Sequence, residues 1–91
     1  MERRSNMPYI TQADRERMAS DINSLSHSIS TVGELNYDVT QLCRRFLINS
    51  QGKYADYNAI VGTLECAKLE FYRRAVAAYE DKKIAEQGDV Y

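Results

Sequence analysis

The chain has 91 residues, of which 44% are hydrophobic and 27% are charged, and its formal net charge is -1. This length and composition fit one soluble globular domain and leave no room for a second. Because the charges nearly balance, general nucleic-acid binding, which needs an excess of cations, is not expected. The sequence has no apolar run of membrane-spanning length, and its charged start lacks the apolar segment of a signal peptide, so we expect no membrane association and a cytoplasmic location.

Residues that interrupt helices are rare in this sequence, which has one proline, Pro8, and four glycines. Alanine, leucine, glutamate, lysine and arginine, which favour helix, are common in the second half of the chain. We therefore predict an all-α fold. Residues 1–8 are expected to form a loose N-terminal arm, and residues 9–91 a single helical domain.

The first predicted helix begins after Thr11, a residue suited to the N-cap, with Asp14 three positions later. It is expected to continue to about residue 31. Its apolar side chains are spaced alternately by four and three positions, which is the pattern of a helix that buries one stripe. The residues of this stripe are Met18, Ile22, Leu25, Ile29 and Val32.

A second helix is predicted from about Glu34 to Ile48, after a break at Gly33. Polar residues and a glycine at 49–53 predict a turn. A third helix is then expected from Tyr54 to about Glu86. The apolar face of the second helix comprises Leu35, Val39, Leu42, Cys43, Phe46 and Leu47.

The third helix is too long for a compact domain of this size. About 32 residues would span roughly 48 Å, whereas the expected radius of gyration is only about 12 Å. Either the helix bends near Ala77 and Ala78, or its end projects and is covered by another chain. Its apolar face is also wide, and small residues such as Gly62 and Cys66 lie nearly opposite.

These features predict a helical hairpin or three-helix unit with a long C-terminal helix, assembled as an oligomer. The alternative is that the first two helices cover the whole apolar surface within one chain.

Motifs for catalysis or metal binding are missing from the sequence. The only histidine, His27, has no acidic residue three or four positions away, and no phosphate-binding loop or nucleophile motif occurs. Cys43 and Cys66 do not form a metal or redox pair and are expected to be buried thiols. We therefore expect no enzyme activity, no cofactor and no bound metal.

Two groups of residues are candidates for binding a ligand or partner. On the third helix, Arg73 and Arg74 could hold phosphate or carboxylate groups in a planar fork, and they follow an aromatic pair. The alternative is that these arginines form ion pairs with carboxylates of the same helix, above all Glu70. The full set of candidates is Asn36, Tyr37, Lys68, Tyr72, Arg73 and Arg74.

Several segments together resemble a family of small uncharacterised helical proteins found in phage, prophage and bacterial genomes. The resemblance covers about residues 7–91 and marks Met7 as an alternative start. Ala78 stands where that family often has proline, so a proline kink is not implied. The segments are Met7–Ile10, Gly33–Tyr37, Gly62–Glu65, Lys68–Arg74 and Tyr79–Tyr91, the last beginning Tyr-Glu-Asp-Lys-Lys-Ile and ending Gly-Asp-Val-Tyr.

The resemblance supplies a context but no activity. It implies a phage-encoded accessory protein that works by non-catalytic binding and inhibits or sequesters a host defence component. The expected partners are further copies of the chain together with a host protein or a nucleotide-like small molecule. One alternative is an oligomeric sponge that binds a nucleotide immune signal between protomers. Another is a structural or assembly protein.

Overall fold

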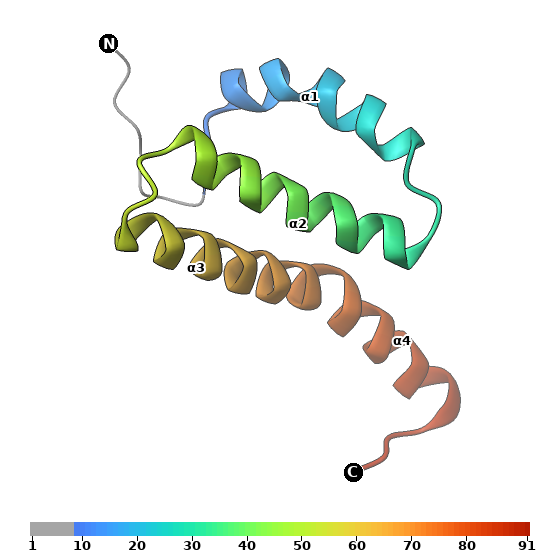
Figure 1. Ribbon diagram of the computed structural model, residues 1–91. Coiled ribbons are helices and arrows are strands. Elements are labelled where there is room, and N and C mark those ends of the chain that lie inside the picture. Colours follow the sequence, from blue (N-terminus) through green and yellow to red (C-terminus); the bar gives the residue numbers. More distant parts are fainter. Residues whose placement is uncertain (1–8) are drawn as a thin grey trace.

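The computed structural model describes residues 9–91, so the arm predicted over residues 1–8 lies outside the described residues. The described chain forms helices joined by short connections and contains no strand. The elements are α1 (Gln12–His27), α2 (Val32–Asn49), α3 (Tyr54–Phe71), the π-helical segment η1 (Tyr72–Val76) and α4 (Ala77–Gln87), as Figure 1 shows. The prediction of an all-α fold is therefore confirmed.

Helix α1 begins as predicted but ends earlier. The Thr11 hydroxyl oxygen accepts a hydrogen bond from the backbone N–H of Asp14 at 3.1 Å, which caps the first turn. At the other end, the Ser28 hydroxyl donates to the Leu25 carbonyl at 2.7 Å. The predicted end near residue 31 is wrong because serine side chains compete for the last carbonyls and the next helix starts almost at once.

Helix α2 begins at Val32, two residues before the predicted start, because Thr31 and Glu34 form a capping box. The Thr31 hydroxyl oxygen accepts from the Glu34 N–H at 3.1 Å, and the Glu34 carboxylate accepts from the Thr31 N–H at 2.9 Å. Gly33 lies inside the first turn rather than in a break. The break predicted there is wrong because the cap supplies the hydrogen bonds that a glycine-containing first turn needs.

The predicted third helix is continuous from Tyr54 to Gln87, but its hydrogen bonding changes to the π-helical pattern over η1. In Figure 1 the helix axis changes direction after α3, and α4 extends away from α2. The bend therefore lies just before the predicted position at Ala77 and Ala78. Gly88, with φ of 92°, ends the helix in a backbone conformation that favours glycine.

Packing between helices is sparse. Helices α2 and α3 pack as an antiparallel hairpin, whereas no Cα atom of α1 comes within 8 Å of a Cα atom in another helix. None of the described residues is buried. The Cα radius of gyration is 16.8 Å, against about 12 Å expected for a compact chain of this length.

The hairpin is therefore the predicted arrangement that the chain adopts. The alternative in which the first two helices cover the apolar surface is wrong, because α1 stands off and the α2–α3 contact covers only part of each helix. Among residues 9–91, no helix combines the length and the apolar composition that a membrane span requires.

Candidate binding site

The cationic candidates lie where α3 meets the π-helical segment. Lys68 belongs to the last turn of α3, and Arg73 and Arg74 belong to η1. Their side chains are 68%, 67% and 70% exposed, respectively. Because this part of the helix continues past its contact with α2, the three cations are open to solvent and to a partner.

Both arginines pair with the same carboxylate. Arg73 donates to Oε1 of Glu70 at 3.1 Å, and Nε of Arg74 donates to the same oxygen. The hydrogen bond from Arg74, and then the positive charge of Arg73, hold the pKa of Glu70 below its ordinary value, although partial desolvation opposes this. One negative charge thus faces two positive charges, which leaves a local excess of one positive charge.

Tyr72 is held by a carboxylate on the following helix. Its hydroxyl donates a hydrogen bond of 2.9 Å to Oε1 of Glu80. This bond, together with the negative charge of Glu80, raises the pKa of the Tyr72 phenol. The ring of Tyr72 remains half exposed, so one face is available for stacking.

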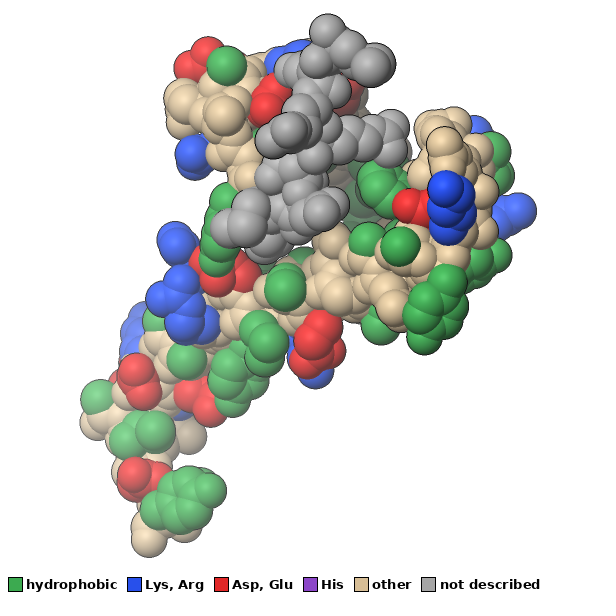
Figure 2. Space-filling model, turned by 90° about the vertical axis from the view of Figure 1, so that its left-hand side faces the viewer, with side chains coloured by type: hydrophobic (Ala, Val, Ile, Leu, Met, Phe, Trp, Pro, Cys, Tyr) green, Lys and Arg blue, Asp and Glu red, His purple; other side chains and the backbone are tan. Residues whose placement is uncertain are grey.

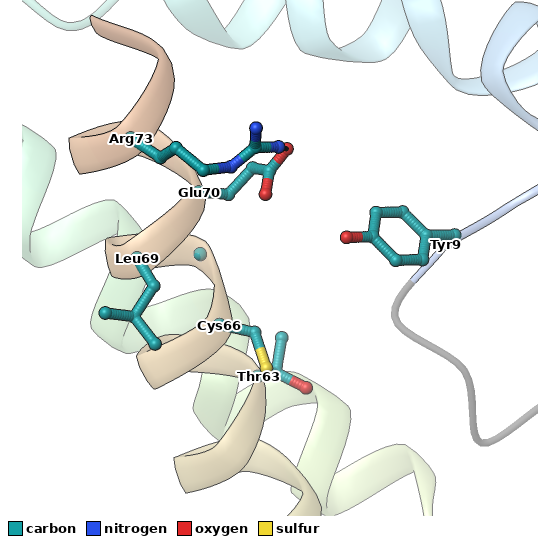
Figure 3. Close-up of a pocket in the computed structure, with 7 residues that line it drawn as sticks. Tyr9, Thr63, Cys66, Leu69, Glu70 and Arg73 are labelled. Carbon is teal, nitrogen blue, oxygen red and sulfur yellow. Dashed lines mark hydrogen bonds and ion pairs between the residues drawn. The ribbon is translucent and has the colours of Figure 1, made fainter. Parts of the chain in front are cut away.

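A hollow of about 400 Å³ lies beside this cluster, between α3 and the segment that precedes α1. Figure 3 shows the ring of Tyr9 directed across the hollow toward Glu70 and Arg73. The hollow thus combines an aromatic ring, an ion pair and a hydroxyl on one open surface. Its lining comprises Tyr9, Thr63, Cys66, Ala67, Leu69, Glu70 and Arg73.

Asn36 and Tyr37 lie near the beginning of α2. Tyr37 lines a different hollow, with Ser28, Thr31 and Glu34 among its neighbours. Since α2 and α3 run antiparallel, the start of α2 and the end of α3 lie at the same end of the hairpin (Figure 1). The structure nevertheless places Tyr37 and Arg73 in separate hollows.

Sequence reasoning did not select Tyr9 as a site residue and treated Glu70 only as an ion-pair partner. More than fifty positions separate Tyr9 from Thr63, so no spacing pattern could join them. The three ion pairs predicted within the helix, Lys68 with Glu65 and both arginines with Glu70, are confirmed. The prediction of two buried thiols is wrong, because Cys66 is exposed and Cys43 only half-buried in a chain without a closed core.

Within residues 9–91, no three His, Cys, Asp or Glu side chains gather closely enough to hold a metal ion. His27 is exposed at the end of α1, where its Nδ1 lies 2.7 Å from the carbonyl oxygen of Asn23. The cluster at η1 can therefore bind anions and stack on rings, using guanidinium groups, a phenol and a nearby aromatic ring.

Taken together, the helical hairpin and its exposed cluster define a small all-helical protein with a candidate binding surface. A family model, described as a domain of unknown function (DUF6899), matches residues 7–90. The chain belongs to this family. No curated protein and no solved structure matches the chain.

Proposed function

We propose that the protein is a phage-encoded accessory protein that assembles as a homo-oligomer and acts by non-catalytic binding, inhibiting or sequestering a component of host defence. The observation that carries the proposal is the open surface of the chain. Not one of the described residues is buried, and large apolar side chains are exposed on every helix. Figure 2 shows such side chains over the body and along the projecting C-terminal limb.

The exposed area supports self-association. The chain exposes 8547 Å², whereas a compact monomer of 10.5 kDa exposes about 5400 Å² by the usual scaling with mass. The difference, roughly 3000 Å², exceeds several times the ~800 Å² that one partner buries in an ordinary stable interface. Large exposed apolar patches are typical of surfaces that bind other chains.

The cationic cluster at η1 supports binding of a further molecule. Arg73 and Arg74 are exposed on a segment that projects beyond the α2–α3 contact, and π-helical segments are frequent at functional sites. Arginine and tyrosine are also the residues that most often anchor protein interfaces. The resemblance to phage and prophage proteins supports a role against host defence.

A protection assay tests this function. Bacteria that carry a defence system would express the protein and then be infected with a sensitive phage. We expect the wild-type chain to restore plaque formation and the Arg73→Ala/Arg74→Ala double variant to lose most of that effect. Arg17→Ala is the single-charge control, because Arg17 is 69% exposed and pairs with Asp14 in the same i,i+3 geometry. Failure of the wild-type chain against a panel of defence systems would contradict the proposal.

A nucleotide sponge is the second candidate, and the hollow beside Tyr9 favours it. An aromatic ring opposite a guanidinium, with the Thr63 hydroxyl on the same surface, can hold a base and a phosphate. Residues of a second copy could complete this open site between protomers.

Native mass spectrometry of protein recovered gently from a defence-active host extract separates the candidates. Extra mass of a few hundred daltons per site, lost in Arg73→Ala, would support the sponge. An oligomer bound to a host protein would support the inhibitor. An oligomer that carries neither would favour a structural or assembly role.

A further inference from the structure

The chain carries two apolar surfaces that do not cover each other. One is the stripe on α1, where Met18 is 42% and Ile22 57% exposed and Leu25 lies one turn further on. The other is a groove along the α2–α3 seam with a volume of about 220 Å³. Its lining includes Leu42, Phe46, Ala59, Ile60, Thr63 and Leu64.

Helix α1 cannot be stable as an isolated element. It has 16 residues, and several are serine, asparagine or aspartate, which have low helix propensity. Isolated helices of this length are marginal in water even when their sequences are rich in alanine. The amphipathic stripe of α1 must therefore be covered by another surface for the helix to persist.

The connection between α1 and α2 holds α1 away from its own hairpin. Oε1 of Glu34 accepts hydrogen bonds from the Ser30 N–H at 2.8 Å, the Ser30 hydroxyl at 2.9 Å and the Thr31 N–H at 2.9 Å. These bonds fix the short connection at its junction with α2. With α1 held there, none of its Cα atoms reaches within 8 Å of another helix, although packed helices lie with axes only about 8–10 Å apart.

We infer that α1 of one copy lies in the α2–α3 groove of a second copy, with the exchange made reciprocally. This inference rests on the homo-oligomer of the proposed function and names the surfaces that build it. A second copy is the occupant because each chain supplies both complementary parts, the stripe and the groove. The net charge of -1 also imposes little repulsion between copies.

The residue types of the two surfaces fit this arrangement. Ala59 and Thr63 are small and leave a hollow between Leu42, Phe46 and Leu64, into which a larger side chain can insert. Met18 and Ile22 are spaced by one helical turn, as side chains that enter such hollows are. Reciprocal exchange of an identical element closes an assembly without a new surface.

Isotope-filtered NMR tests the inference on the full-length chain. Labelled and unlabelled copies would be unfolded together and refolded, so that only contacts between different chains give filtered signals. We expect such contacts from the methyl groups of Met18 and Ile22 to those of Leu42 and Leu64. Filtered contacts that join other surfaces, with none from α1, would overturn the exchange while leaving the oligomer intact.

Mass measurement by light scattering supplies the second arm. Ile22→Asp is expected to lower the mass toward 10.5 kDa. Ser20→Asp places the same charge on the opposite face of α1 and is expected to leave the mass unchanged. Equal masses for wild type and Ile22→Asp would overturn the exchange alone. A wild-type mass of one chain would overturn both the exchange and the homo-oligomer.

Discussion

The hydroxyl of Tyr72 donates a hydrogen bond of 2.9 Å to the carboxylate of Glu80, eight residues further along the same helix. In a regular α-helix, residues seven apart lie close to one face, and residues eight apart are turned away from it. The π-helical segment adds one residue to a turn, which shifts the following helix by about one position. Tyr72 and Glu80 are thereby brought to one side, and their hydrogen bond spans the bend.

Tyr72→Phe is expected to loosen α4 relative to α3, because it removes the hydroxyl and keeps the ring. Backbone amides of Ala77–Gln87 should exchange with solvent severalfold faster, while those of α2 remain unchanged. Hydrogen exchange followed by mass spectrometry measures both. Tyr79→Phe is the control, since the Tyr79 hydroxyl makes no hydrogen bond within residues 9–91. Equal effects of the two substitutions would show that the hydrogen bond does not hold the bend.

The capping box at the start of α2 gives a second prediction. Thr31→Ala removes the hydroxyl oxygen that accepts from the Glu34 N–H and should lower the free energy of unfolding by about 1 kcal/mol. Thr40→Ala removes the same atoms within the helix, where the hydroxyl only donates to the Asn36 carbonyl, and should be neutral or slightly stabilising. Urea unfolding of both variants checks the difference, and a larger loss in Thr40→Ala would contradict it.

The same cap predicts a dependence of stability on pH. Hydrogen bonds from Ser30, first from its N–H and then from its hydroxyl, and a further bond from the Thr31 N–H lower the pKa of Glu34 below its ordinary value of 4.5. A lowered pKa in the folded state means that the contribution is present above pH 4.5 and is lost as the pH falls through the lower folded value. Glu34→Gln should therefore lose stability at pH 7 and show a smaller decrease on acidification. Identical acid profiles for the two proteins would refute this assignment.

The helices could be predicted because their signals are local. Thr11 with Asp14, and the apolar periodicity from Met18 to Leu25, depend on neighbours within one or two turns. The early start of α2 was missed because Gly33 was taken as a break, whereas the reciprocal Thr31–Glu34 cap decided the boundary.

The candidate site could be predicted only in part for the same reason. The pairs that Glu70 makes with Arg73 and Arg74 follow from helical spacing. The approach of Tyr9 to Arg73 depends on how a distant segment is placed, and no pattern in the sequence encodes that placement. The π-helical segment was also not predictable, since its composition is that of an ordinary helix.

Two glycines are expected to respond in opposite directions to alanine. Gly52, in the turn between α2 and α3, has φ of 65°, so Gly52→Ala should cost about 1 kcal/mol of unfolding free energy. Gly62 lies within α3, and a Cβ atom there would meet nothing within 4 Å. Gly62→Ala should therefore stabilise the chain by about 0.5–1 kcal/mol. A loss of stability and of assembled mass in Gly62→Ala would show that another backbone approaches this small-residue face instead of the α2–α3 groove.

Thermal stability should depend on protein concentration, because the monomer lacks a buried core and the proposed assembly supplies one. Association that occurs only in the folded state raises the midpoint of unfolding as concentration increases. Calorimetric scans over a hundredfold range of concentration measure this shift. The dependence should weaken in Ile22→Asp and remain in Ser20→Asp. A midpoint independent of concentration in the wild-type chain would contradict assembly.

Glu70→Gln is expected to strengthen anion binding at the π-helical segment. Glu70 is charged at neutral pH because Arg74 and Arg73 lower its pKa, and it offsets one of their two positive charges. Glutamine keeps the shape and removes the charge, so both guanidinium groups become available to an anion. Since these ion pairs are exposed, the overall stability should change little.

Titration calorimetry with inorganic pyrophosphate, at two salt concentrations, measures the effect of Glu70→Gln. We expect affinity to rise severalfold and the gain to shrink at the higher salt concentration, because surface charges are screened. Glu65→Gln is the control, since Glu65 lies on the same helix and pairs with Lys68 at 3.1 Å instead of with the arginines. Equal gains in the two variants would indicate a general charge effect. An absence of binding in all three proteins would exclude an anion site at Arg73 and Arg74 and favour a surface that recognises only protein.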